Sequence, residues 1–124
     1  MIKGIGVDTI ELARIERVYK AYGERFLNRI YAPEEREYAL RYKDPVPRLA
    51  ARFAAKEACM KALGTGWSNG VRWKDIVVKN SRSGKPEIEL RGKARDLSAR
   101  LEVECIHVSI THSREHAMVI VLFE

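Results

Sequence analysis

The segment FAAKEACMKALGTG, at residues 53–66, constrains the fold of this chain more than any other part of the sequence. Its pattern predicts a helix from about residue 47 to 63, which Gly64 and Gly66 would end. Five alanines fall in one stripe of this helix, roughly 100° wide: Ala51, Ala54, Ala55, Ala58 and Ala62. Because alanine side chains are short, such a stripe allows the helix backbone to lie very close to a sheet.

The remaining periodicities predict one α+β domain over residues 1–124, with an antiparallel sheet packed against the long helix and shorter helices. A strand is expected over residues 2–7, with helical periodicity from around Thr9. Two further helices are expected over residues 24–30 and from Pro33. The later elements are expected to be strands at 75–79 and 86–90, a helix at 92–101, and strands at 104–113 and 116–124.

Two groups of apolar residues predict contacts beyond the alanine stripe. Phe53 and Met60 lie on the opposite side of the long helix, so a second subunit or a bound ligand is expected to cover them. Residues 117–123 are apolar throughout. We therefore expect a central strand covered on both faces, partly by another subunit.

Composition favours an anionic partner. The net charge is +6 and the isoelectric point is near 9.5, although a basic surface that only confers solubility is an alternative. No stretch approaches the roughly 20 apolar residues of a membrane span, and the first residues lack a signal-peptide pattern, so a cytoplasmic protein is expected. Cys59 and Cys105 lie in apolar sequence and are expected to be buried thiols in a reducing compartment.

Three charged residues have both a structural and a functional interpretation. Glu57 and Lys61, one helical turn apart, could form an ion pair that contributes only about 0.2–0.5 kcal/mol on an exposed helix. Asp8, in the segment GIGVDTIE, could form a helix-capping box with Glu11. It also lies near a strand end beside a helix start, where anion and metal sites are common. The residues themselves leave both interpretations open.

A convergence of Asp8 and Glu57 would favour a hard cation such as Mg²⁺, which takes few protein oxygens and leaves positions for phosphate and water. Lys61 would then bind the same phosphates. The segment GKP at residues 84–86 is not a Walker motif, because no serine or threonine follows the lysine.

Four segments together resemble the short, single-domain 4'-phosphopantetheinyl transferases of the holo-acyl-carrier-protein synthase family: GIGVD, FAAKEACMKALGTG, SGKPEIEL and SITHSREHAMVIVLFE. The resemblance runs in order from about residue 2 to 124, and the combination of GVD with KEAxxKALGxG is specific. It implies the fold of that family. It also implies transfer of the 4'-phosphopantetheine arm from coenzyme A to a serine of apo acyl carrier protein, with release of adenosine 3',5'-bisphosphate.

The resemblance assigns roles to the three charged residues. In this family the matching aspartate and glutamate hold Mg²⁺, so Asp8 and Glu57 are expected to be metal ligands. Lys61 would neutralise the pyrophosphate of coenzyme A. Longer relatives carry a further acidic ligand where this chain has Ile10, so only two protein ligands are expected. A water positioned by the metal or a carboxylate is the hypothesis for the base that takes the serine proton.

The resemblance also implies contacts with the donor and the acceptor. Coenzyme A is expected to contact Arg52, Lys61, Gly64, Gly66, Gly84, Lys85, Pro86, Ser109, Thr111 and His112. An acidic acyl carrier protein is expected to dock on a basic surface, the alternative to which is a solvated charged face: Arg14, Arg17, Lys20, Arg25 and Phe26. A homotrimer with active sites between subunits is typical of the family.

Two other functional classes remain as alternatives. A nucleic-acid-binding module is disfavoured because no binding motif is recognisable and the aromatic residues are not interleaved with the basic runs. A non-catalytic trimer that binds coenzyme A or carrier protein is disfavoured by the catalytic-type residues at positions 8, 57 and 61. His107 and His116 are expected to be structural or solvent-facing.

Overall fold

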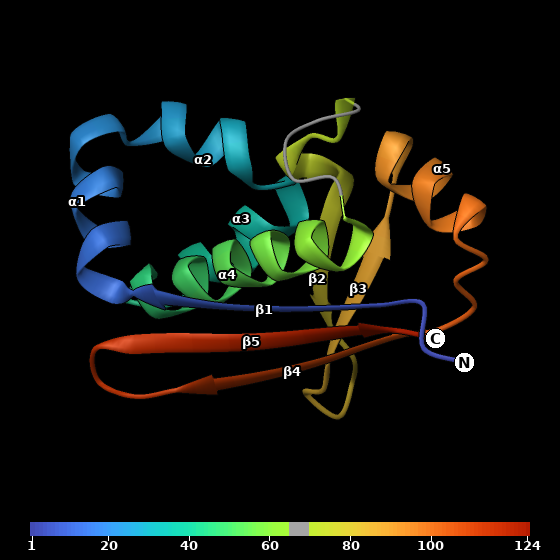
Figure 1. Ribbon diagram of the computed structural model, residues 1–124. Helices are drawn as coiled ribbons and strands as arrows, with labels where there is room; N and C mark the ends of the chain where they lie inside the picture. The colour runs from blue at the N-terminus through green and yellow to red at the C-terminus, as the bar shows by residue number, and fades with distance from the viewer. Residues whose placement is uncertain (65–69) are drawn as a thin grey trace.

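The computed structural model of the protein describes residues 1–64 and 70–124 (Figure 1). Its elements are, in chain order, β1 (Gly4–Glu11), α1 (Leu12–Tyr22), α2 (Glu24–Ile30), α3 (Pro33–Leu40), α4 (Val46–Leu63), the short 3₁₀ helix η2 (Trp73–Asp75), β2 (Ile76–Asn80), β3 (Pro86–Leu90), α5 (Gly92–Arg100), β4 (Ile106–His112) and β5 (His116–Phe123). The predicted α+β class, with one long helix and several shorter ones, is confirmed.

Two antiparallel sheets support the long helix. The larger has the strand order β1-β5-β4, and the smaller is the β2–β3 hairpin, whose second strand contacts β4. Helix α4 lies along β1 and β5 on one face of the larger sheet, while α1 stands at one end of α4 and α2 runs above it (Figure 1). The site elements β1 and α4 are therefore direct neighbours.

The alanine stripe packs as predicted, and glycines on β1 make the close contact possible. All five alanines are buried. A Cβ atom on Gly6 would lie 1.8 Å from the carbonyl oxygen of Ala58, and one on Gly4 would lie 2.3 Å from that of Ala62. Only glycine allows a backbone to approach this closely. The glycines of β1 and the alanine stripe of α4, which are far apart in the sequence, therefore pack against each other.

The boundary between β1 and α1 differs from the prediction. The strand runs to Glu11, and the helix begins at Leu12 instead of around Thr9. Residues 9–11 pair with residues 116–118 of β5 in an antiparallel ladder. The ladder keeps this segment extended, and β-branched Thr9 and Ile10 suit a strand better than a helix.

Phe53 and Met60 are buried within the chain, so the prediction of a cover from another subunit or a ligand is wrong. Phe53 stacks on Trp73 with ring centroids 4.8 Å apart, and Phe26 of α2 approaches to 6.5 Å. Met60 is 3% exposed. The cover comes from segments on either side of α4 in the sequence, which the helix pattern alone cannot reveal.

Strand β5 is central, as predicted, but this chain covers only one of its faces. The side chains that point towards α4 are buried, whereas those on the opposite face are exposed, except for the half-buried Leu122. We call this opposite surface the apolar sheet face, formed by Ile5, Val7, Met118 and Ile120. The predicted cover on both faces is not met within the described part of one chain.

A buried ion pair anchors the other side of α4. Lys56 Nζ donates to Glu35 Oε1 at 2.7 Å, and both side chains are fully buried. Lys56 also donates to the carbonyl oxygens of Trp73 and Ile76. Glu35 accepts from the backbone N–H groups of Ala32, the N-cap residue of α3, and Val78 of β2. Because these groups satisfy one another, the pair links α3, α4 and β2 without leaving an unpaired buried charge.

The two cysteines differ in environment. Both are free, and Cys59 is buried as predicted, which raises the pKa of its thiol to about 12. Cys105 is exposed, so its predicted burial is wrong; it precedes β4 at the open end of the sheet. Among the described residues no helix is both long and apolar enough to cross a membrane.

Candidate active site

Asp8 lies in the middle of β1, where it pairs with Val119 of β5. Its side chain is 11% exposed and is on the same side of the strand as Gly6 and Ile10, facing α4. Helix α1 begins only at Leu12, and its N-cap residue makes no side-chain capping hydrogen bond. The capping interpretation of Asp8 is therefore wrong, which leaves it free to act as a ligand.

Lys61 reaches from α4 to β1. Its Nζ donates to the carbonyl oxygen of Val7 at 2.9 Å and lies 3.3 Å from Asp8 Oδ1. Glu57, one turn earlier on α4, lies close enough to Asp8 for the negative charge of Asp8 to raise the pKa of the Glu57 carboxyl. In the described part of the chain, Lys61 forms its ion pair with Asp8 and not with Glu57. The three predicted catalytic side chains thus converge at one place.

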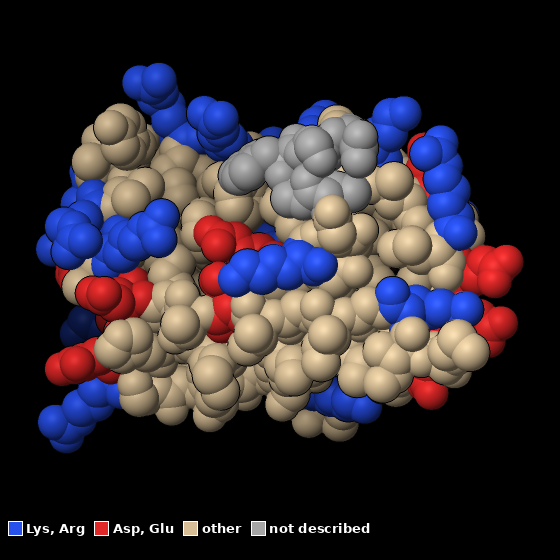
Figure 2. Space-filling view, in the orientation of Figure 1, with Lys and Arg blue, Asp and Glu red and all other residues tan. Residues whose placement is uncertain are grey.

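Burial is the main reason why the pKa of Glu57 is raised above its ordinary value, and the negative charge of Asp8 is the second. Arg14 of α1 and Lys61 oppose this effect, because their positive charges favour the ionised carboxyl. The net increase means that these cations do not fully offset burial and repulsion. Figure 2 shows acidic side chains with a basic one beside them in the centre of the face over α4 and β1.

These residues fit a hard divalent cation. Asp8 and Glu57 are neighbouring carboxylates, and carboxylate oxygens are the donors that Mg²⁺ prefers. Ile10 follows on the same side of β1, is 4% exposed and offers no ligand atom. The chain therefore presents two carboxylate ligands here, and the metal role of Asp8 and Glu57 stays a prediction.

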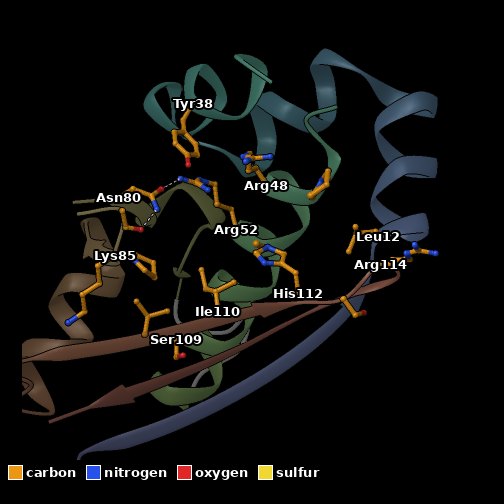
Figure 3. Close-up of a pocket in the computed structure, with 16 residues that line it drawn as sticks. Leu12, Tyr38, Arg48, Arg52, Asn80, Lys85, Ser109, Ile110, His112 and Arg114 are labelled. Atoms are coloured by element: carbon orange, nitrogen blue, oxygen red, sulfur yellow. Dashed lines mark hydrogen bonds between the residues drawn. The ribbon is translucent and has the colours of Figure 1, made fainter. Parts of the chain in front are cut away.

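A cavity of about 750 Å³ lies between α4, the β2–β3 hairpin and β4 (Figure 3). Six of the residues predicted to contact coenzyme A line it: Arg52, Gly84, Lys85, Pro86, Ser109 and His112. Arg48 and Arg114 add two further cationic side chains. A cavity with several cationic groups suits a polyanionic ligand.

Arg52 is held at the wall of this cavity. Its guanidinium carbon lies 4.3 Å from the centre of the Tyr38 ring, and Nη2 donates to Asn80 Oδ1 at 2.7 Å. The residue is 4% exposed, and its Nε has no hydrogen-bond partner among the described residues. A buried guanidinium with an unused donor can bind an anionic group strongly.

Sequence reasoning missed several cavity residues. Arg48 lies one turn before Arg52 on the same helix face, so helical spacing could have found it. It stacks on Tyr42, with 3.3 Å from its guanidinium carbon to the ring centre. Asn80 and Arg114 come from the ends of two hairpins, and only the fold brings them to α4.

Other predicted coenzyme A contacts lie away from this cavity. Gly64 ends α4 in the left-handed conformation, with φ of 79°, as its predicted role as a helix stop requires. Thr111 is exposed and pairs with Met118. Gly66 is outside the described residues.

The predicted docking residues lie on α1 and α2. Arg14, Arg17, Lys20 and Arg25 are exposed, and Figure 2 shows basic side chains gathered over these helices. Phe26 differs, because it is 8% exposed and packs edge-on against Tyr31. It forms part of a shallow hollow instead of projecting, together with Val18, Tyr22, Arg25 and Arg29.

Comparison with known proteins decides the family. The model of the 4'-phosphopantetheinyl transferase superfamily matches residues 4–121. The chain belongs to this superfamily. A curated relative, the holo-[acyl-carrier-protein] synthase of Solibacter usitatus, is 49% identical over 124 residues, which cover 100% of this chain and 99% of the relative.

Two solved structures of the superfamily confirm the predicted fold. The crystal structure of holo-[acyl-carrier-protein] synthase from Neisseria meningitidis has a TM-score of 0.92 at 35% identity, covering 100% of this chain and 99% of that one. The enzyme from Bacillus anthracis, in complex with CoA (3',5'-ADP), has a TM-score of 0.83 at 38% identity, covering 99% and 96%. The predicted family and enzyme class of this phosphopantetheinyl transferase are confirmed, whereas its individual site residues stay predictions.

Proposed function

We propose that this phosphopantetheinyl transferase moves the 4'-phosphopantetheine arm of coenzyme A to a serine of an apo acyl carrier protein and releases adenosine 3',5'-bisphosphate. Relatives named holo-[acyl-carrier-protein] synthase support the acceptor, and the Bacillus anthracis complex supports the donor. The observation that carries the proposal is the convergence of Asp8, Glu57 and Lys61 where β1 meets α4.

Asp8 and Glu57 are the residues that would hold Mg²⁺. When bound, this ion supplies positive charge that stabilises the phosphate oxygens during transfer. Lys61 contributes a second, fixed positive charge, and an ammonium group has three donors, so Val7 and Asp8 leave at least one for a phosphate oxygen. Phosphoryl-type transfer depends mainly on such positioning and charge. A water held by a carboxylate is the proposed acceptor of the serine proton.

The cavity is the proposed site for the adenosine bisphosphate end of coenzyme A, and its position argues for a site shared between subunits. Arg52 precedes Lys61 by nine residues, which at about 100° per residue places the two side chains on opposite sides of α4. One chain therefore holds the transfer residues and the cationic cavity on two different surfaces. We propose that the cavity of one subunit faces the Asp8–Glu57 pair of its neighbour.

The apolar sheet face supports assembly into the homotrimer that this arrangement requires. Ile5 and Val7 are 57% and 51% exposed, and Met118 and Ile120 continue the surface across the neighbouring strand. A contiguous exposed apolar patch usually marks an interaction site. Burial of this face between subunits would also supply the second cover expected for β5.

The basic side chains on α1 are the proposed docking surface for the acidic carrier protein. Arg14 contributes positive charge at Glu57, so this surface adjoins the transfer residues. Lys20 pairs with Glu16 at 3.1 Å, whereas Arg17 and Arg25 have no acidic partner within the described residues. Their positive charge is therefore available to an acidic partner. We place the reaction in fatty acid biosynthesis in the cytoplasm, and the two free thiols fit such a reducing compartment.

Intact-mass analysis tests the reaction directly. Apo acyl carrier protein is incubated with coenzyme A, Mg²⁺ and the wild-type protein, Asp8→Ala or Asp96→Ala, the last being a control at an exposed position on α5. We expect a mass increase of one phosphopantetheine with wild type and Asp96→Ala. The increase should be absent with Asp8→Ala, which removes a proposed metal ligand, and after treatment with EDTA, which removes the metal ion.

The same experiment separates transfer from binding. If the folded protein binds coenzyme A but modifies none of several acidic carrier proteins, the non-catalytic interpretation replaces the proposal. If Asp8→Ala retains full activity, the reaction stands and the metal assignment is wrong.

A further inference from the structure

We propose that Cys105, His107 and Glu124 form a second metal site, which binds a zinc-type divalent ion. The three side chains are exposed, and one ligand atom from each lies within 4.8 Å of the other two. None of the three is a proposed transfer residue or lines the cavity near Arg52, and they lie at the end of the sheet on the same side as the apolar sheet face. The site also gives a role to the exposed thiol that the sequence places in apolar surroundings.

The backbone fixes the three positions at one end of the larger sheet. The N–H of Cys105 donates to the carbonyl oxygen of Glu124 at 2.8 Å, and that of Glu124 donates to Cys105 at 2.9 Å. Residues that exchange two such bonds lie directly opposite each other, with side chains on the same face. His107 follows two residues after Cys105 and shares that face. Its Nε2 already lies 3.0 Å from Glu124 Oε1.

The donor set selects the metal. A thiolate and an imidazole favour zinc and similar transition metals, whereas Mg²⁺ prefers oxygen donors alone. Ligand atoms bound to tetrahedral zinc at about 2.0–2.3 Å lie roughly 3.5 Å from one another. The three ligand atoms here are now within 4.8 Å of one another, so small rotations of these exposed side chains would bring them to the zinc-bound spacing. Three protein ligands leave the fourth position for water.

The location separates this ion from the transferred phosphate. Glu124 lies five residues along the chain from Val119, the partner of Asp8, which is about 17 Å in an extended strand. A metal bound there would join the end of β5 to the start of β4. Since the unfolded chain does not hold the three ligands together, binding should stabilise the folded protein.

Cobalt titration provides the test, because Co²⁺ takes zinc sites and its bond to a thiolate absorbs light. Untagged, reduced and metal-stripped protein is titrated with Co²⁺ in excess Mg²⁺, which keeps the oxygen-only site occupied, and Zn²⁺ is added afterwards. We expect one Co²⁺ per chain, a sulfur-to-cobalt absorption band, displacement by Zn²⁺ and a higher Tm with either ion.

Matched variants assign the ligands. Cys105→Ser should abolish the absorption band, and His107→Gln and Glu124→Gln should each weaken binding by more than about ten-fold. His116→Gln, at an exposed histidine on the other end of β5, should bind like wild type. All four positions are exposed, so circular dichroism should show folded proteins.

Three results would overturn the proposal. Absence of the band at one equivalent of Co²⁺ would exclude a thiolate ligand. A band that survives Cys105→Ser would assign the metal to another thiol. One metal for every two or more chains would indicate a link between exposed thiols of different molecules and not a site within one chain.

Discussion

Glu57 carries a charge that its surroundings disfavour, and this predicts how the metal-free protein responds to pH. Its folded-state pKa lies above the ordinary 4.5, so the folded protein binds this proton more tightly than the unfolded chain. The resulting stability is present below 4.5 and is lost as pH rises through the raised value. We therefore expect Glu57→Gln to raise the Tm of metal-free protein at neutral pH and to flatten its dependence on pH in that window.

The matched control is Glu87→Gln on β3, an exposed carboxyl that should leave the Tm unchanged. Mg²⁺ should raise the Tm of wild type and of Glu87→Gln, but not that of Glu57→Gln. Near-normal turnover by Glu57→Gln at saturating Mg²⁺ would contradict the assignment of this residue as a metal ligand.

The contact between β1 and α4 depends on glycine, so it should tolerate no added methyl group. In Gly6→Ala the new Cβ would meet the backbone oxygen of Ala58 at 1.8 Å, and neither backbone can move without disturbing the site. We expect a loss of about 3 kcal/mol in the free energy of unfolding, measured by urea denaturation. Turnover should fall as well, because Asp8 would move relative to Glu57.

Thr9→Ala on the same strand is the control for that experiment. Thr9 points away from α4 and is exposed, so its replacement should cost less than about 1 kcal/mol. Equal losses from the two variants would show that strand propensity, and not the close helix contact, determines the effect.

Assembly should depend on the apolar sheet face. Light scattering should give three times the 14.2 kDa of one chain for wild type. Ile120→Asp should dissociate the trimer and abolish turnover, because a charge cannot be buried there without a partner. Leu40→Asp is the control, since Leu40 on α3 is also 42% exposed but lies outside this face. A trimer that survives Ile120→Asp would place the interface elsewhere.

The same assembly predicts complementation between two inactive variants. Asp8→Ala removes the metal site and Arg52→Ala disrupts the cavity, so neither trimer should turn over. After subunit exchange, some active sites in mixed trimers combine the intact cavity of an Asp8→Ala chain with the intact metal site of an Arg52→Ala chain. Part of the activity should therefore return. No recovery despite demonstrated exchange would mean that each chain works alone.

Carrier-protein docking should be electrostatic. Arg17→Glu should raise the KM for carrier protein at low salt, and added salt should reduce the difference because it screens charge. Arg95→Glu makes the same charge change on α5, away from α1, and should have little effect. An unchanged KM in Arg17→Glu would show that docking occurs on another surface.

The sequence by itself determined most of the elements and the chemistry of the transfer site. Helix α4 was predictable because its alanine stripe and the glycine that ends it are patterns within one short segment of the sequence. Glu57 and Lys61 could be singled out because one turn of helix separates them at the edge of that stripe. Patterns this short can be interpreted without knowing which distant segments pack against them.

Only the tertiary structure decided which side chains meet. The role of Asp8 depended on how far β1 pairs with β5, and the partner of Lys61 depended on the β1–α4 contact. The burial of Phe53 and the exposure of Cys105 likewise follow from packing between distant segments. Periodicity describes one element at a time, whereas strand register and helix packing are set by residues up to a whole chain length apart.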